Sequence, residues 1–331
     1  MTARLILTTK RLFLSLALVS TVHAQWEQLP PLPEPNGGFM CGVQGDCIVV
    51  VGGTNWEGGK KNWLRVVHAF DPAAGKWTKL SDLGRPAAYA AALQEDYGFA
   101  YLGGTDGQQS LKELVVISGN KTSPPFNFGL FAMHSLPDSL VLTAGGHVAG
   151  RYVLAGGTDT APNIAGVQRS VHAVETINGR FEVRPMADYP GKPFAVAASS
   201  TVADELFVFG GMNYDEAAKA PVNSTEAYAF SPEKNAWRKL SPLEVANRGL
   251  TAVTLDEQHI YLAGGYTNDF TADAVIYDVK ADSYRKAKPS PYAAMVALVK
   301  YEGFVYCLGG EDKKQSRTDK FFRIPAAELL K

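Results

Sequence analysis

The stretch that decides the fold is FVYCLGG at residues 304–310, in which a short apolar strand ends in two glycines. Five more segments of the same form precede it, and successive glycine pairs lie 45 to 54 residues apart. Self-similarity at a regular period indicates a repeat architecture, in which no unit can bury its apolar face alone. The six copies are CIVVVGG (47–53), GFAYLGG (98–104), RYVLAGG (151–157), ELFVFGG (205–211), HIYLAGG (259–265) and FVYCLGG (304–310).

Each copy lies in a unit of four expected strands. An apolar strand such as TAVTL (251–255) precedes the glycine pair, and a loop, an aromatic strand and a large aromatic residue follow most pairs. Four strands at a period of about 50 residues resemble the Kelch repeat and predict an all-β fold, a six-bladed Kelch β-propeller. Glycine permits the positive φ of a tight turn where this strand meets its neighbours. We expect Trp77 and Trp237 to pack between blades, with Phe181 and Tyr284 as weaker equivalents.

The two ends of the propeller are predicted to meet in the last blade. After FFRI (321–324) the last unit lacks an outer strand with its aromatic residue. The segment WEQLPPLP (26–33) supplies one, because it matches WTKL (77–80) and WRKL (237–240). An N-terminal strand that completes the last blade closes the ring and removes exposed sheet edges. We therefore predict one propeller domain over residues 25–331, with no linker and no second module.

The first 24 residues differ from the rest of the chain. A positively charged start precedes the apolar run LFLSLALV (12–19), and Ala24 places a small residue before Gln25. This pattern is typical of a secretory signal peptide, so we predict a signal peptide over 1–24 and a periplasmic or secreted protein. The run is too short for a bilayer span, although an uncleaved anchor stays open. No later segment is long and apolar enough, so we expect no membrane span in the mature chain.

Composition and cysteine content limit the possible functions. Hydrophobic residues make up 46% of the 331 residues and charged residues 20%, which permits a large core and argues against disorder. A net charge of −1 offers no basic stripe for nucleic acid, so we expect no nucleic-acid partner. Cys41 and Cys47 flank a short turn, and two interpretations stay open: a disulfide across a hairpin, or two small buried apolar side chains.

Polar residues shortly before the inner strand of each unit are expected to converge on the funnel of a propeller. Three of them are cationic in a chain of near-zero net charge, so the funnel is predicted to favour an anionic ligand. The alternative is that these side chains cap strand ends and bind exposed carbonyls. The set is Asn36, Arg85, Asp138, Lys192, Arg248, and Ser290 with Tyr292.

The last unit alone has a Glu and an Arg six residues apart after its glycine pair, Glu311 and Arg317. A carboxylate can accept a proton from a sugar hydroxyl, and a guanidinium can bind a substrate carboxylate with two parallel hydrogen bonds. The alternative is a surface ion pair across a loop, which would contribute less than about 1 kcal/mol.

Within the Kelch family, GGEDKKQSRTDKFF (309–322) resembles the active-site blade of the periplasmic N-acetylneuraminate epimerases, the sialic acid mutarotases. Their motif is Gly-Glu, a short loop, and Arg-Thr-Asp leading into an apolar strand. The resemblance implies that Glu311 is the proton acceptor and that Arg317 contacts the substrate. GGTNWEGGKKNW (52–63) is similar to the loop of the blade that follows the active site in those enzymes, and the blade order resembles the cyclically permuted mutarotase branch. Where the epimerases carry a long insertion, GYTNDFT (265–271) is short, which implies a more open funnel.

We therefore predict an exported isomerase, a mutarotase that interconverts the anomers of an acidic sugar, with N-acetylneuraminate as the first candidate. One base, one cation and a water-excluding pocket suffice for this reaction, so no metal and no organic cofactor is implied. The sequence identifies no protein partner. The predicted catalytic residues are Glu311 and Arg317, and the predicted substrate-binding residues are Asn55, Lys60, Arg85, Lys192 and Arg248.

Two other functions stay open. The first is a non-catalytic Kelch module that binds carbohydrate or protein, which would have no anomerisation rate for Glu311→Gln to remove. The second is a copper oxidase similar to galactose oxidase, which needs two His and a Tyr cross-linked to Cys on one metal. A copper analysis would decide this, since the histidines are scattered over the repeats. They are His68, His134, His147, His172 and His259.

Overall fold

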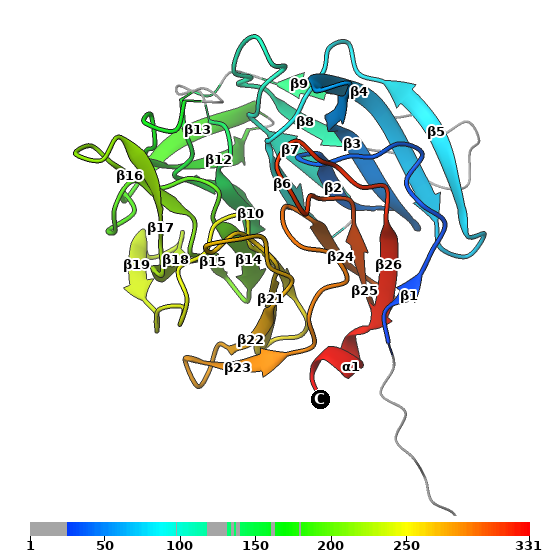
Figure 1. The fold of residues 1–331 in the computed structure, drawn as a ribbon. Coiled ribbons are helices and arrows are strands. Elements are labelled where there is room, and N and C mark those ends of the chain that lie inside the picture. The colour runs from blue at the N-terminus through cyan, green and yellow to red at the C-terminus, as the bar shows by residue number, and fades with distance from the viewer. Residues whose placement is uncertain are drawn as a thin grey trace, which may run out of the picture.

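The computed structural model describes residues 25–96, 98–117, 131–133, 136, 140–159, 163–178 and 180–331. Six four-stranded antiparallel sheets stand around a central axis (Figure 1). The predicted six-bladed propeller is therefore confirmed. The predicted signal peptide over 1–24 lies outside the described residues. Among the residues that are described, no helix has the length and apolar character needed to cross a membrane.

Each blade is numbered from its innermost strand outward. Blade one comprises β2 (Met40–Gln44), β3 (Cys47–Glu57), β4 (Lys60–Asp71) and β5 (Lys76–Asp82). Blade two comprises β6 (Ala91–Gln94), β7 (Phe99–Leu102), β8 (Leu114–Ile117) and β9 (Phe131–Met133). Blade three comprises β10 (Ala144–Val148), β11 (Arg151–Ala155), β12 (Val171–Ile177) and β13 (Arg180–Met186).

The second half of the chain repeats this arrangement with one added hairpin. Blade four comprises β14 (Ala198–Val202), β15 (Glu205–Phe209), β18 (Ala227–Ser231) and β19 (Ala236–Lys239), with a hairpin of β16 (Met212–Asp215) and β17 (Ala220–Asn223). Blade five comprises β20 (Thr251–Thr254), β21 (His259–Ala263), β22 (Ala274–Asp278) and β23 (Ser283–Ala287). Blade six comprises β24 (Ala297–Tyr301), β25 (Phe304–Leu308), β26 (Phe321–Pro325) and β1 (Glu27–Gln28), and α1 (Ala326–Leu329) follows β26.

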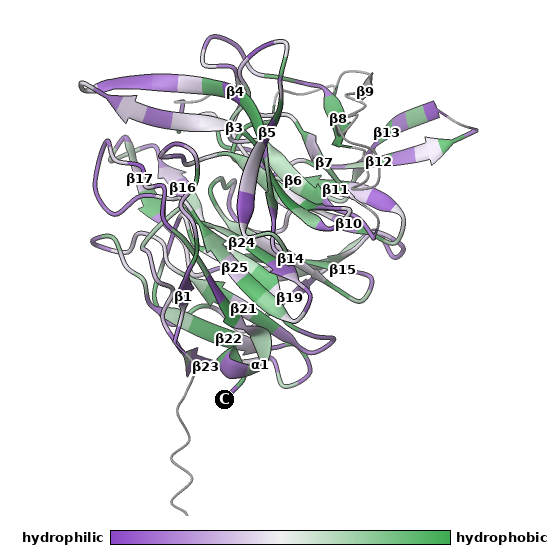
Figure 2. Cartoon of the chain, turned by 90° about the vertical axis from the view of Figure 1, so that its right-hand side faces the viewer, coloured by the Kyte–Doolittle hydropathy of each residue, from purple (hydrophilic) through white to green (hydrophobic). Residues whose placement is uncertain are grey.

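Burial within a blade explains the apolar strand before each glycine pair. In β11, β15, β21 and β25 the last four residues are all buried. Such a strand is covered on both faces by neighbouring blades, so it reads as a continuous hydrophobic run. The outer strand β13 alternates exposed and half-buried residues, as expected where one face meets solvent. Figure 2 shows hydrophobic central strands and more hydrophilic projecting hairpins.

The glycine pair joins each blade to the next one. In all six pairs both glycines have positive φ. The N–H of the second glycine donates to a backbone carbonyl of the loop that leads into the next blade, at 2.7 to 3.2 Å. A Cβ on Gly52 would lie 2.1 Å from the carbonyl oxygen of Ala87, so only glycine fits there. The sixth of these bonds, from Gly310 to Asn36, joins the last blade to the first.

The aromatic residues of the outer strands hold neighbouring blades together at the rim. Each donates its polar hydrogen to a carbonyl just after the outer strand of the preceding blade. The pairs are Trp77 with Pro30 at 3.1 Å, Trp237 with Ala187 at 2.9 Å, Tyr284 with Ser241 at 2.8 Å and Trp26 with Pro289 at 2.9 Å. Trp26 thus acts as the aromatic residue of blade six, and β1 pairs with β26 as predicted.

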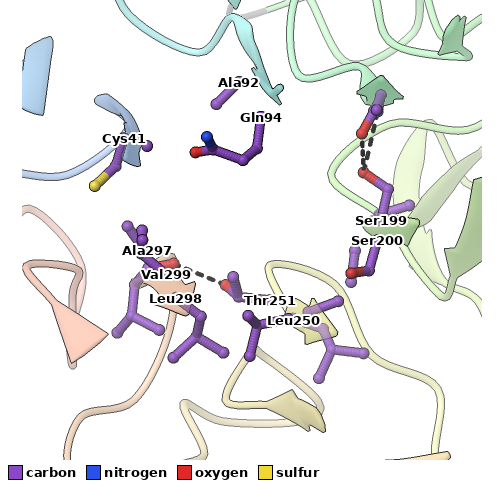
Figure 3. A pocket seen from close by; sticks show the side chains of 18 of the residues that line it. Cys41, Ala92, Gln94, Ser199, Ser200, Leu250, Thr251, Ala297, Leu298 and Val299 are labelled. Carbon is purple, nitrogen blue, oxygen red and sulfur yellow. Dashed lines mark hydrogen bonds between the residues drawn. The ribbon is translucent and has the colours of Figure 1, made fainter. Parts of the chain in front are cut away.

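Six residues, one from each blade, surround the axis, and we call them the axial ring. Each precedes an innermost strand and has a left-handed φ between 53° and 69°. Five of their N–H groups donate to the axial-ring carbonyl of the preceding blade at 2.7 to 3.1 Å. These residues and the innermost strands of all six blades line a cavity of about 420 Å³ (Figure 3). The axial ring consists of Gly38, Tyr89, Leu142, Val196, Gly249 and Met295.

No disulfide joins Cys41 and Cys47. In the β2–β3 register Cys41 lies opposite Val50, and Cys47 lies opposite Gln44. Cys47 is buried and Cys41 packs against the core between blades one and six. Burial raises the pKa of the Cys41 thiol. Of the two interpretations left open by the sequence, the structure has the small apolar side chains.

Candidate functional site

Glu311 and Arg317 occupy a place that every blade has. The residue directly after the glycine pair faces a residue at the end of the following loop, and in blades one to five the two form a β-bridge or strand pair. All six places lie in the described residues, and blade six is the one that fills them with charges. In chain order they hold Thr54–Trp63, Thr105–Ser110, Thr158–Val167, Met212–Asn223, Tyr266–Phe270 and Glu311–Arg317.

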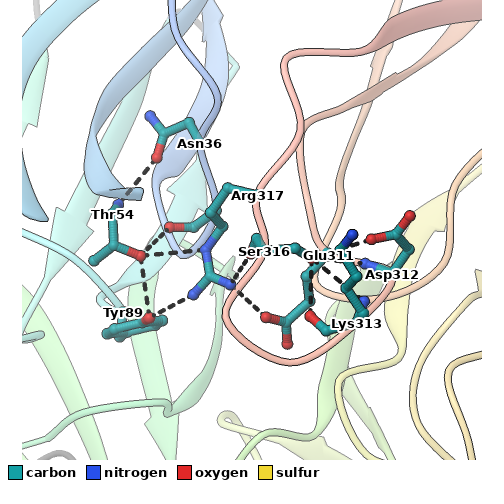
Figure 4. A network of polar contacts seen from close by, with 9 residues as sticks. Asn36, Thr54, Tyr89, Glu311, Asp312, Lys313, Ser316 and Arg317 are labelled. Atoms are coloured by element: carbon teal, nitrogen blue, oxygen red, sulfur yellow. Dashed lines mark hydrogen bonds and ion pairs between the residues drawn. The ribbon is translucent and has the colours of Figure 1, made fainter. Parts of the chain in front are cut away.

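The Arg317 side chain is almost completely buried and is held from three blades (Figure 4). Nη1 donates to the Glu311 carboxylate and to the Ser316 carbonyl at 2.7 Å. Nη2 donates to the Tyr89 hydroxyl at 3.0 Å, and Nε donates to Thr54 Oγ1 at 3.3 Å. Four of the five guanidinium N–H groups therefore have protein partners. The side chain of Arg317 is 6% exposed and that of Glu311 is 22% exposed, so this is not a solvated surface pair.

Asn36 fixes the blade-one side of this network. Its Nδ2 donates to the Gly52 carbonyl at 2.8 Å, and its Oδ1 accepts from the Thr54 N–H at 3.0 Å. Asn36 is 3% exposed. Asn247 makes the equivalent two bonds in blade five. The role of Asn36 is therefore to hold Thr54 in place, as the strand-capping alternative expected.

Tyr89 lies between the Glu–Arg pair and the β3–β4 hairpin. Its hydroxyl is 3.2 Å from Thr54 Oγ1, and its ring meets that of Trp63 edge to face at 5.9 Å. Lys61 Nζ lies 4.7 Å from the centre of the Tyr89 ring and 4.9 Å from that of Trp63, within cation–π range. Burial raises the pKa of Tyr89, but the positive charges of Arg317 and Lys61 and hydrogen bonds from Lys61 and Thr54 outweigh it, so the pKa is lowered.

Comparison with known proteins agrees with this architecture. Residues 36–84 match the Kelch motif, and residues 164–297 match the family described as N-acetylneuraminate epimerase. The chain is a Kelch-repeat protein with a region of the epimerase family. That region ends before Glu311 and Arg317, so the match itself does not include the charged pair.

Individual relatives of this Kelch-repeat protein cover different shares of it. Kelch-like protein 35 of Mus musculus is 27% identical over 84% of this chain and 44% of its own length. Kelch-like protein 36 of Bos taurus is 24% identical over 81% of this chain and 42% of its own length. N-acetylneuraminate epimerase of Yersinia pestis is 37% identical over 24% of this chain and 21% of its own length. The chain thus spans less than half the length of these curated relatives.

The two residues predicted on the blade-one loop of the Kelch protein lie on the β3–β4 hairpin. Asn55 follows Thr54 on β3, and its amide contacts Asn62 at 3.0 Å and Glu34 at 3.4 Å. Lys60 is exposed at the hairpin tip, and it is the next residue, Lys61, that faces Tyr89. Because side chains alternate along a strand, the two lysines point to opposite faces.

The three predicted funnel cations lie at other places in the propeller. Arg85 forms an ion pair with Glu113 within blade two. Lys192 is exposed on the loop that leads into blade four. Arg248 lies over the Tyr266 ring, 4.5 Å from its centre, and Nη1 donates to an asparagine oxygen on β17 at 2.8 Å.

No contact joins these three cations to Glu311 or Arg317 within the described residues. Their substrate-binding roles stay predictions, and Asp138 lies outside the described residues. In the described ranges, no three His, Cys, Asp or Glu side chains gather as a metal site would require.

The sequence reasoning missed Tyr89 and Lys61. Tyr89 stands in the apolar stretch AAYAAAL (87–93), which reads as a continuous inner strand, whereas β6 begins only at Ala91. Aligning the repeats on their glycine pairs would have supplied a signal. In that alignment Tyr89 takes the place of Gly38 and Gly249, where a left-handed residue is required.

Proposed function

We propose that this Kelch propeller is an isomerase that interconverts the anomers of an acidic sugar, with N-acetylneuraminate as the first substrate to test. The observation that carries the proposal is the Glu311–Arg317 pair. It is a half-buried carboxylate held by an almost fully buried guanidinium in the one blade whose facing pair is charged. The resemblance of GGEDKKQSRTDKFF (309–322) to the epimerase active-site blade adds the reaction class.

The proposed chemistry starts at Glu311. Its carboxylate accepts the proton of the anomeric hydroxyl, the sugar ring opens, and the carbonyl closes again on its other face. The 22% exposure of Glu311 leaves the carboxylate within reach of a ligand, whereas the 6% exposure of Arg317 suits a fixed support. Arg317 holds the carboxylate in place, and its one N–H without a partner among the described residues is proposed to contact the substrate carboxylate.

The surrounding predictions belong to the same proposal. Export through a signal peptide over 1–24 would place the protein in the periplasm or outside the cell, where free sugar acids can be met. Asn55 lies one residue from Thr54, so it is the nearest in sequence of the five predicted substrate-binding residues to the charged pair. The exposed Lys60, Arg85 and Lys192 could act only in attracting an anion over a distance.

Proton NMR of freshly released α-N-acetylneuraminate, with and without the protein, tests the proposal. We expect the protein to accelerate equilibration of the anomers. Glu311→Gln should lower that rate at least about 100-fold while the affinity for the sugar remains. Glu216→Gln, an exposed carboxylate on the β16–β17 hairpin, is the matched control. A protein that binds the sugar without any acceleration would be the non-catalytic binding module instead.

A further inference from the structure

The reaction proposed above moves two protons, and Glu311 accounts for one of them. When a cyclic sugar opens, the anomeric hydroxyl loses a proton and the ring oxygen gains one. A single carboxylate leaves the ring oxygen to depart as an alkoxide, which is a poor leaving group at neutral pH. A second group that donates a proton at that oxygen would lower the barrier, typically by a factor of about 100 or more.

Arg317 places one hydroxyl beside the Glu311 carboxylate. Nη1 of its guanidinium donates to Glu311, and Nη2 donates to the phenol of Tyr89 at 3.0 Å. The carboxylate and the phenol therefore lie at the same edge of one planar group (Figure 4). The two oxygens of an anomeric centre are likewise neighbours, since both are bonded to one carbon. A base and an acid held side by side match these two oxygens.

The Tyr89 side chain is fixed in this place by its surroundings. A Cβ on Gly38 would lie 2.2 Å from Tyr89 Cε1, so blade one has a glycine where the phenol ring packs. The ring of Trp63 meets it edge to face, and the hydroxyl is 3.2 Å from Thr54 Oγ1. Tyr89 also lines the axial cavity, which Glu311 and Arg317 do not. The phenol thus joins the charged pair to a hollow that solvent or a ligand can occupy.

We propose that Tyr89 is the second catalytic residue of the anomerisation and donates the proton to the ring oxygen, an inference that rests on the proposed function. In the opening step the anomeric O–H bond breaks and its proton goes to Glu311. The bond from the anomeric carbon to the ring oxygen breaks, its electron pair stays on that oxygen, and the Tyr89 proton joins it. In the closing step the new hydroxyl returns its proton to Tyr89 and adds to the other carbonyl face, while Glu311 protonates the former carbonyl oxygen.

The charges around Tyr89 suit the phenolate that this step leaves behind. Arg317 faces the hydroxyl from the loop after β25, and Lys61 faces the ring from β4. Glu311 lies on the far side of the guanidinium, while Gly38, Thr54 and Trp63 bring no charge. Burial raises the pKa of the phenol, and the two cations lower it by more, so that the net direction is down. A tyrosine of this kind is a better acid at neutral pH than an ordinary one.

The first test compares Tyr89→Phe with Tyr214→Phe, a control on β16 outside the site. Each protein is assayed for anomer exchange by NMR and for sugar affinity by calorimetry. Tyr89→Phe is expected to lower the exchange rate about 100-fold with affinity near that of the wild type, and Tyr214→Phe to change neither. A Tyr89→Phe rate equal to the wild-type rate overturns the proposal. Loss of rate and affinity together would make Tyr89 a positioning residue for Arg317 and would also overturn it.

The second test follows ionisation without turnover. The ultraviolet band of tyrosinate in the wild type should show one tyrosine that ionises at lower pH than the others, and Tyr89→Phe should remove that step. The exchange rate should fall as pH rises through the same step, because the acid must be protonated. Lys61→Met removes a neighbouring positive charge and should move both to higher pH, whereas Lys60→Met should leave their position in pH unchanged.

These readouts separate the two proposals. A wild-type protein that does not accelerate exchange removes the proposed function, whatever Tyr89 does. A wild-type protein that accelerates exchange, with no low-pH tyrosinate step or with a step unaffected by Lys61→Met, keeps the function and overturns the role of Tyr89.

Discussion

Blades five and six share a backbone framework but differ in the pair of side chains that follows the glycines. In blade five Tyr266 and Phe270 meet edge to face at 5.3 Å, and Arg248 lies over the tyrosine ring. In blade six the same two places hold Glu311 and Arg317 in an ion pair. The second glycine of each pair makes the same bond to the next blade, at 3.2 Å in blade five and 3.0 Å in blade six.

The difference shows how a repeat fold can carry a site in one blade only. The glycines and the bonds between blades set the position of the facing pair, whatever its side chains are. An aromatic pair there adds packing, whereas a charged pair there adds chemistry and depends on its neighbours. Tyr89 of blade two and Thr54 of blade one hold Arg317, and in the described residues nothing equivalent surrounds Phe270.

The largest effect is expected from breaking the facing pair of blade six. Arg317→Met leaves the half-buried Glu311 carboxylate without its partner and should destabilise the protein by about 2 to 4 kcal/mol and abolish exchange. Phe270→Ala, which breaks the pair of blade five, should cost about 1 kcal/mol. Urea unfolding measures both. The double variant Glu311→Gln/Arg317→Met should recover part of the stability, and a double variant less stable than Arg317→Met would contradict a buried ion pair.

A smaller effect is expected from the asparagine that precedes each of these seams. Asn36→Ala and Asn247→Ala each remove two buried hydrogen bonds and should destabilise the protein by similar amounts, about 2 kcal/mol. Only Asn36→Ala should also lower the exchange rate, by up to about 100-fold, because Thr54 holds Arg317. Equal rate losses in both variants would show that the two seams do not differ in function.

The smallest effect is expected at the rim, where the two blades use the same device. Trp26→Phe and Tyr284→Phe each remove one hydrogen bond to the preceding blade while keeping an aromatic ring. Each should lower the unfolding free energy by about 1 kcal/mol, without changing exchange. Thermal unfolding measures both. A much larger loss for Trp26→Phe would mean that the two-residue strand β1 depends on this one bond for closure.

The sequence predicted the blade number, the closure by Trp26 and the charged pair, because each of these repeats or breaks a pattern. A glycine pair that recurs six times gives the blades, and a Glu and an Arg in one copy only give the exception. Trp26 could be found because it matches Trp77 and Trp237, and all three make the same hydrogen bond at the rim.

The rest of the site depends on three-dimensional placement that no pattern in the sequence displays. Tyr89 looks like one more apolar strand residue until the left-handed turn before β6 is known. Lys61 instead of Lys60 faces the site because a one-residue step along a strand reverses the side chain. Arg85 was counted with the funnel cations, but Glu113 of its own blade already neutralises it.

The axial ring has a consequence for how the protein comes apart. Each of its five hydrogen bonds takes its donor from one blade and its acceptor from the blade before. A blade that loosens must therefore break bonds with its neighbours at the hub as well as at the rim. In open solenoids a terminal repeat can fray while the others stay folded. Here the hub works like a hoop around a barrel, so the six blades should melt as one cooperative unit.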